Sequence, residues 1–155
     1  MAMASEQLTG GFSIRPMQAE DFPAMLSLWQ RCEGIGLNSA DTPEGTALFL
    51  KRNPGLSLVL LKQGELAGTC LAGHDGRRGF LYHLAIDPAD RKKGMGAHLA
   101  GRCTEALLRE GILRCHIVVY ASNREGQTFW KKLGWQPREN LLLMSTELPL
   151  PFTQP

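Results

Sequence analysis

The sequence lacks the features that would direct the chain to a membrane or a nucleic acid. It has no apolar run near the roughly 20 residues that a membrane-spanning helix needs, and no basic segment followed by an apolar core opens it as a secretory signal would. Its 17 Lys and Arg residues nearly balance 15 Asp and Glu residues, for a formal net charge of +2. We therefore expect a cytoplasmic protein that binds neither membranes nor nucleic acid, with any basic site confined to a local cluster.

Metal-ligand patterns are also missing. No two cysteines form a CxxC pair, and the histidines are scattered without the spacing of zinc ligands. Each cysteine lies inside an apolar segment, as small buried residues do in a reducing compartment. We therefore expect no metal site, and four buried thiols at Cys32, Cys70, Cys103 and Cys115.

Length and composition predict one globular domain. With 155 residues, 43% of them apolar, the chain has the usual size of a single domain and can bury a core without covalent staples. Met1–Gly11 is small, polar and aperiodic, which predicts a flexible leader. The prolines of residues 149–155 predict a tail, which leaves a single domain at residues 12–148.

Hydrophobic periodicity divides this domain into short strands and amphipathic helices. The strands are expected at Phe12–Arg15, Leu56–Lys62, Leu66–Gly73, Gly79–Ile86, Leu113–Tyr120 and Leu141–Leu148. The helices are expected to run from Asp21 to the glycines at 34 and 36, and at Thr42–Arg52, Gly94–Glu110 and Arg124–Leu133. This order predicts a mixed α/β fold (α+β), with a mostly antiparallel sheet flanked by helices.

The segment LAIDPADRKKGMGAHL, residues 84–99, carries the clearest chemical signal. An apolar strand ends at Ile86, a turn follows, and Arg91–Gly96 opens a helix. The first N–H groups of a helix have no internal partner and carry the positive end of its dipole, while the glycines let a ligand approach the backbone. The pattern predicts a site for phosphate or pyrophosphate. It is neither a Walker loop nor a Rossmann fingerprint, since Leu99 stands where a third glycine belongs.

These residues resemble the GNAT superfamily of N-acetyltransferases. Arg91-x-x-Gly94-x-Gly96 after a strand and an Asp-Pro turn is similar to the family's motif A, and NREGQTFWKKLGW at residues 123–135 is similar to its motif B. The resemblance covers Phe12–Leu148 and looks closest to small bacterial, YpeA-like members, which share the G-x-D-G-x-R-G hairpin found here at Gly73–Gly79. It implies the GNAT fold and acetyl-CoA as the acetyl donor.

The resemblance also implies where acetyl-CoA lies, in an opening between the strands that precede the two motifs. The backbone of Leu84, Ala85 and Ile86 would bind the pantetheine and offer an N–H to the thioester oxyanion. Asn123 would lie beside the pantetheine, with Phe129 and Trp130 near the far end of the cofactor. The pyrophosphate would lie in a cradle formed by Arg91, Lys92, Lys93, Gly94, Met95, Gly96 and Ala97.

Two departures from the family pattern concern proton transfer. Many members carry a tyrosine that protonates the leaving thiolate where this chain has Trp130, whose indole N–H is not acidic. Strand alternation places Phe80, Tyr82, Leu84 and Ile86 on one face, which lacks the carboxylate that some members use as a base. Tyr82 is therefore the candidate catalytic group and Tyr120 the weaker alternative donor. His83 is expected on the opposite face, packed under a helix or acting as a base, and His116 has no motif support.

The acceptor implied by the resemblance is a primary amine of a small molecule or peptide, which attacks acetyl-CoA directly in a ternary complex. The substrate contacts are expected at Trp29, Glu33 and Tyr82, beside an acceptor loop at Gly34–Thr42. Two other functions stay open, a CoA-binding sensor or interaction module without turnover, and a nucleotide site. A homodimer through the sheet edge is a further prediction.

Overall fold

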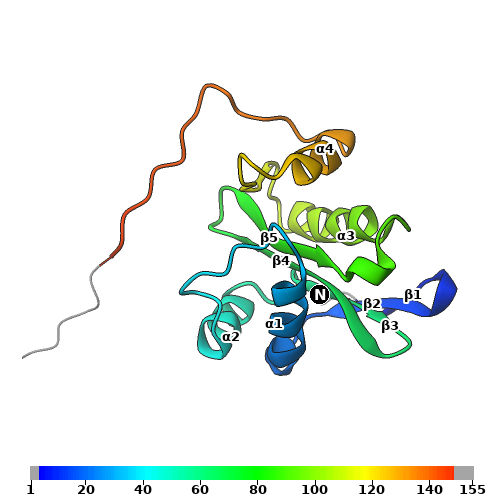
Figure 1. Cartoon of the computed structure of the whole chain (residues 1–155). Helices are drawn as coiled ribbons and strands as arrows, with labels where there is room; N and C mark the ends of the chain where they lie inside the picture. The colour runs from blue at the N-terminus through cyan, green and yellow to red at the C-terminus, as the bar shows by residue number, and fades with distance from the viewer. Residues whose placement is uncertain (1–3, 149–155) are drawn as a thin grey trace, which may run out of the picture. The chain divides into compact units, whose positions relative to one another are not determined.

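The computed structural model describes residues 4–148 (Figure 1). The chain forms two compact units, Met1–Asn123 and Arg124–Pro155. The first unit holds one sheet in which the strands follow chain order. Neighbouring strands are antiparallel except the last pair, which is parallel. The strands are β1 Glu6–Gln7, β2 Phe12–Pro16, β3 Leu58–Lys62, β4 Glu65–His74, β5 Gly79–Ile86 and β6 Cys115–His116.

Four α-helices lie close to the predicted ranges, but the first ends at Arg31, before the predicted glycines at 34 and 36. The α-helices are α1 Phe22–Arg31, α2 Pro43–Arg52, α3 Met95–Arg109 and, in the second unit, α4 Arg124–Lys132. Three short 3-10 helices are η1 Thr9–Gly11, η2 Ala19–Asp21 and η3 Pro88–Asp90. The side chain of Thr42 caps α2 by accepting from the Gly45 N–H at 3.0 Å, as serine and threonine commonly do. None of the helices among residues 4–148 combines the length and apolar composition needed to cross a membrane.

The first helix packs its apolar stripe against the middle of the sheet. Met25 and Leu28 of α1 are fully buried, and they join Val59, Leu71 and Ala85 from three strands in one core cluster. The opposite face of the sheet packs on α3, since a Cβ added at Gly79 would lie 2.9 Å from Leu107 Cδ1. The central strands are therefore buried on both faces, which explains their nearly continuous apolar sequences.

The end of the chain departs from the expected strands. The segment Leu113–Tyr120 was expected to be a strand throughout, but the structure assigns only Cys115–His116, which pairs with Gly79 and Phe80. No strand is found at Leu141–Leu148 within the described residues. Strand formation depends on packing and pairing with a neighbouring strand more than on intrinsic propensity, and among residues 4–148 only Cys115 and His116 of these two segments pair with a strand. The tail predicted at residues 149–155 lies outside the described residues.

The beginning of the chain is more ordered than a flexible leader. Glu6 and Gln7 pair with Ile14 and Ser13 as the strand β1. The carboxylate of Glu6 also lies 2.9 Å from Arg102 Nε on α3. These contacts attach residues 6 and 7 to the domain, which the polar, aperiodic sequence did not indicate; Met1, Ala2 and Met3 lie outside the described residues.

A β-bulge at His83 interrupts β5. Thr69 of β4 opposes Ala85, but Leu71 opposes Tyr82. Between these two pairs, β5 therefore contains one residue more than β4. His83 has φ +48°, in the left-handed region that few non-glycine residues adopt. Its carbonyl accepts a hydrogen bond from Thr69 Oγ1 at 2.8 Å, and Thr69 Oγ1 accepts one from Trp29 Nε1 at 2.9 Å. This buried relay holds the bulge against α1.

Replacing Thr69 by valine tests that relay. Valine has nearly the same shape but leaves the Trp29 N–H and the His83 carbonyl without their partner, in a site where Thr69 is fully buried. We expect the free energy of unfolding to fall by about 2 kcal/mol. Urea denaturation measures the change. Thr104→Val is the control, because the Thr104 hydroxyl donates only to the exposed Gly101 carbonyl. Equal stabilities of the two variants would show that the relay contributes nothing.

Candidate functional site

The turn between β5 and α3 forms a cradle of backbone N–H groups. Lys92 and Gly94 both adopt positive φ, +62° and +78°, and they bend the chain into the start of α3. The first helical bond of α3 runs from the His98 N–H to the Gly94 carbonyl at 3.1 Å. The N–H groups of residues 95–97 therefore precede the first helical donor, His98, and have no acceptor within the helix, at the end where the dipole favours an anion.

The cradle is open and positively charged. A Cβ added at Gly94 would meet no other atom within 4 Å, so space is available at this end of α3. Arg91, Lys92 and Lys93 are all exposed. Arg91 is oriented by a 3.1 Å hydrogen bond from its Nε to the Ile86 carbonyl. An open nest of N–H groups with cationic side chains fits a phosphate or pyrophosphate, as the sequence predicted.

A buried carboxylate holds this loop in place. Asp90 is only 5% exposed and accepts from Lys62 Nζ at 2.6 Å and from Lys93 Nζ at 3.2 Å. It therefore joins the cradle to the end of β3 and uses part of the charge of Lys93. The sequence analysis did not single out Asp90, because its partner Lys62 lies 28 residues earlier.

The edge of β5 next to the cradle has no strand beside it. The described part of β6 pairs only with Gly79 and Phe80, so β5 residues beyond Phe80 have no strand partner on that side among the described residues. The predicted pantetheine contacts at residues 84–86 lie along this stretch. Unpaired N–H and C=O groups of an edge strand readily accept an extended ligand. The cradle and this open edge adjoin, because β5 leads directly into the loop.

The acceptor loop lies against the segment that follows β6. A Cβ added at Gly34 would lie 2.6 Å from Asn123 Nδ2, and one added at Gly36 would collide with the Tyr120 hydroxyl. The absence of a side chain at both positions allows this close approach, and φ +85° at Gly34 adds a backbone preference for glycine there. The structure thus brings together the loop at Gly34–Thr42 and two predicted site residues, Tyr120 and Asn123.

The predicted side-chain faces of β5 are wrong beyond Tyr82. Tyr82 and Phe80 stack on one face, with ring centroids 5.8 Å apart. The bulge then places His83 on that same side of the sheet, against Trp29 of α1, with 4.6 Å between ring centroids. Ile86 lies on the other face, near Leu60 and the Cβ position of Gly68. An extra residue in a strand moves every following side chain to the other face, and the alternation rule cannot anticipate it.

The two tyrosine candidates differ in their surroundings. Tyr82 is 41% exposed, and its ring also meets Phe49 of α2 edge-on at 6.0 Å. Partial burial raises the pKa of Tyr82, and the nearby Cys115 thiol adds to the rise. Tyr82 therefore stays protonated at neutral pH and can donate a proton or a hydrogen bond. Tyr120 is 59% exposed and lies beside Gly36.

The predicted substrate contacts on α1 separate into a core residue and a surface residue. Trp29 is 1% exposed and donates to Thr69, so it supports the bulge from below and does not offer a surface to a ligand. Glu33 is exposed just beyond the end of α1, at the start of the acceptor loop. Within the second unit, α4 brings the rings of Phe129 and Trp130 to 5.2 Å and those of Trp130 and Trp135 to 4.9 Å.

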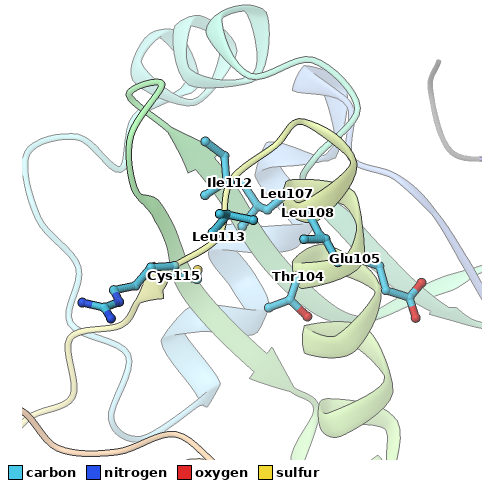
Figure 2. A pocket seen from close by; sticks show the side chains of 8 residues that line it. Thr104, Glu105, Leu107, Leu108, Ile112, Leu113 and Cys115 are labelled. Atoms are coloured by element: carbon cyan, nitrogen blue, oxygen red, sulfur yellow. The ribbon is translucent and has the colours of Figure 1, made fainter.

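Metal-ligating clusters and cavities were the other features that could mark a site. No group of three or more metal-ligating side chains is found among residues 4–148. A cavity of about 270 Å³ lies between the end of α3 and β6 (Figure 2). Burial raises the pKa of its Cys115 thiol to about 11, so this group is not a thiolate at neutral pH. The cavity is lined by Thr104, Glu105, Leu107, Leu108, Ile112, Leu113, Arg114 and Cys115, none of which the sequence analysis placed in the site.

The fold and the site together define an α/β domain that presents an anion cradle beside an open strand edge. Comparison with known proteins identifies the family to which this domain belongs. The model of the acetyltransferase (GNAT) family matches residues 22–135. An acetyltransferase of Pectobacterium atrosepticum is 32% identical over 124 residues, 79% of this chain and 86% of that protein. One from Sodalis glossinidius is 29% identical over 136 residues, 87% of this chain and 94% of that protein.

Solved structures agree in fold. The PaiA N-acetyltransferase of Thermoplasma acidophilum in complex with coenzyme A has a TM-score of 0.68 with 19% identity, covering 78% of this chain and 87% of that one. The ribosomal-protein-S18-alanine N-acetyltransferase of Escherichia coli has a TM-score of 0.66 with 22% identity, covering 79% and 76%. The chain belongs to the acetyltransferase (GNAT) family, and the resemblance seen in its sequence is confirmed at this level.

The ion pairs of Asp90 predict how the stability of the cradle depends on pH. The Lys62 and Lys93 ammonium groups hold the pKa of the Asp90 carboxyl below its usual range. This stabilisation is present above the unfolded-state pKa of about 3.9 and is lost as pH falls through the lower folded-state pKa. We expect Asp90→Asn to lower the free energy of unfolding on the order of 1 kcal/mol near neutral pH, since both lysines are partly exposed.

Chemical denaturation of the two proteins at several pH values checks this expectation. The difference between wild type and Asp90→Asn should shrink steadily below about pH 4. Glu65→Gln, at an exposed position at the start of β4, is the control for loss of one carboxylate. A difference that stays constant down to the acid limit would show that Asp90 acts through packing and not through its charge.

Proposed function

We propose that this chain transfers the acetyl group of acetyl-CoA to a primary amine of a small molecule or a peptide, by direct attack in a ternary complex. The observation that carries the proposal is the cradle at the start of α3 beside the unpaired edge of β5. Family membership supports the reaction class. The coenzyme A complex of the PaiA relative, and an acetyl-CoA complex of a predicted acetyltransferase from Clostridium acetobutylicum with a TM-score of 0.67, support the donor.

Residues from the end of β5 to the start of α3 would bind successive parts of acetyl-CoA. The N–H groups of Met95, Gly96 and Ala97, with Arg91 and Lys92, would hold the pyrophosphate. The backbone at residues 84–86 would bind the pantetheine as a neighbouring strand does, and one N–H there would stabilise the oxyanion. Acetyl-CoA supplies a thioester that an amine can attack without a covalent enzyme intermediate. Asn123 would lie beside the pantetheine, and Phe129 and Trp130 near the far end of the cofactor.

The acceptor is a primary amine of unspecified size. The named acceptors of the relatives differ, since one acts on the alanine of ribosomal protein S18 and another is an N-acetylglutamate synthase from Neisseria gonorrhoeae. Each is nonetheless an amine, which supports the class and favours no member of it. Glu33, at the start of the acceptor loop, is placed to attract a cationic amine, and Tyr82 to guide it or to protonate the leaving thiolate.

Binding of acetyl-CoA is the first test of this proposal. Isothermal titration should show selective binding of acetyl-CoA over ATP and NAD. Gly94→Glu should weaken it by about two orders of magnitude, roughly 2.8 kcal/mol, because the new carboxylate enters the anion cradle and the backbone there has φ +78°. Gly101→Glu, on the same helix at an exposed position with open space around it, is the matched control. Unchanged affinity of Gly94→Glu would contradict the cradle assignment.

The tyrosine that acts in transfer is tested separately. Tyr82→Phe should lower kcat on the order of tenfold to a hundredfold and leave the Kd of acetyl-CoA unchanged, because the hydroxyl lies away from the cradle. A coupled assay of free CoA thiol over a panel of primary amines measures the rate. Tyr120→Phe in the same assay separates the two candidates. Binding of acetyl-CoA with no acetylation of any amine would favour the sensor or interaction module.

A further inference from the structure

A carboxylate from the acceptor loop meets a histidine of the β5 bulge. His83 Nε2 lies 2.8 Å from Asp41 Oδ1, although the two residues are 42 positions apart in the chain. Their side chains are 12% and 8% exposed. An ionised carboxylate only accepts hydrogen bonds, so Nε2–H of His83 is the donor and Nδ1 carries the lone pair in the neutral ring.

Both partners are held rigidly. The other oxygen of Asp41 accepts from the Asn38 N–H at 2.8 Å, which closes a tight turn in the loop. The His83 ring stands against Trp29, and its carbonyl is fixed by Thr69. A histidine oriented by a carboxylate through one nitrogen, with the other nitrogen available, is the arrangement that enzymes use to accept protons.

The second ring nitrogen of His83 reaches solvent. Nδ1 has no hydrogen-bond partner among the described residues, and it does not belong to the buried polar atoms that lack a partner. It is therefore not fully buried, in a side chain that is 12% exposed. Of the groups around the ring, Asp41 from the loop is the charged one, whereas Trp29 from α1 and Thr69 from β4 are uncharged, and Tyr82 precedes His83 on β5.

The position of the pair suits the reacting end of the site. The bulge lies between the last residues of β5 that pair with β6, Gly79 and Phe80, and the stretch at 84–86 that leads to the cradle. Asp41 belongs to the same loop whose Gly34 and Gly36 lie against Asn123 and Tyr120. His83 is therefore placed where the acceptor loop meets the open strand edge.

We propose that His83, oriented by Asp41, accepts the proton that the acceptor ammonium must lose before it attacks; this inference rests on the proposed acetyl transfer. The ammonium gives one proton to His83 Nδ1, and the neutral amine nitrogen forms a bond to the thioester carbon. The C–S bond then breaks, and the second nitrogen proton goes to the leaving thiolate. The products are the amide, CoA thiol and an imidazolium that returns its proton to solvent, so atoms and charge balance.

The test compares His83→Asn and Asp41→Asn with wild type. Asparagine tolerates the left-handed backbone of position 83, so the bulge is retained. The acceptor is the best amine of the panel, and methylamine at high concentration where every panel amine reacts slowly. Near neutral pH, kcat/KM of His83→Asn should fall about a hundredfold or more, with a smaller fall for Asp41→Asn. The Kd of acetyl-CoA should stay unchanged in both.

A pH profile separates proton transfer from positioning. Basic amines lose their own proton near pH 10, so the deficit of His83→Asn should shrink as the pH approaches that value. His74→Asn is the control and should match wild type throughout; His74 is the last residue of β4, and its Nδ1 accepts only the Gly76 N–H.

The outcomes keep the two proposals apart. Acetylation by wild type with an equal rate and pH profile for His83→Asn would overturn the role of His83 and leave the proposed function intact. A loss that is the same at every pH would also overturn it, because a residue that only positions others is not replaced by hydroxide. If wild type acetylates no amine at all, the proposed transfer itself fails and this inference fails with it, whatever the variants do.

Discussion

The bulge at His83 is the constraint on which the rest of the site depends. The bulge holds His83, a non-glycine residue, at φ +48°. This conformation costs energy and persists only where the surrounding structure holds it. The surroundings do so with a buried hydrogen-bond relay from Trp29 through Thr69 to the His83 carbonyl. The same irregularity shifts the register between β4 and β5 and reverses the faces of the last β5 residues, so one extra residue sets the side on which His83 and Ile86 lie.

Two acidic residues attach loops of the site, which have no regular structure of their own, to strands of the sheet. Asp41 attaches the acceptor loop to His83, and Asp90 attaches the cradle loop to Lys62 on β3. Each carboxylate is largely buried and has two polar partners, which favours a single loop conformation over several. Loops that carry binding groups are otherwise the most mobile parts of a domain. The site is therefore built from loops but positioned by the sheet.

The parts of this structure that follow from short-range sequence patterns were predicted well. The range Gly79–Ile86 for β5 agrees with the structure, and α3 begins one residue after the predicted start at Gly94. The cradle was found because its glycines, cations and helix start are contiguous. The strand expected at Leu113–Tyr120 was wrong over most of its length, because its formation depends on a partner strand and not on its own β-branched residues.

The features that the sequence did not indicate all depend on contacts between distant segments. Asp41 is the one charged residue of the loop Gly34–Thr42, and nothing near it in the sequence points to a histidine 42 residues away. The bulge has no glycine to mark it, and a polar Thr69 within an apolar strand was its one local sign. Period-2 alternation assumes an uninterrupted strand, so it assigned His83 to the wrong face for a reason that local patterns cannot detect.

The replacement of the family's usual tyrosine by Trp130 becomes intelligible when the two proton transfers are compared. A thiol has a pKa of about 8.5 and an alkylammonium one of about 10.4. Near neutral pH the thiolate is thus a tolerable leaving group without a donor, whereas the acceptor amine is almost entirely protonated and cannot attack. The proton acceptor is the more demanding requirement. In the proposed reaction that group is His83, held in the bulge by Asp41 and Thr69, and the second proton of the amine nitrogen goes to the thiolate, with Tyr82 as a candidate relay in that transfer.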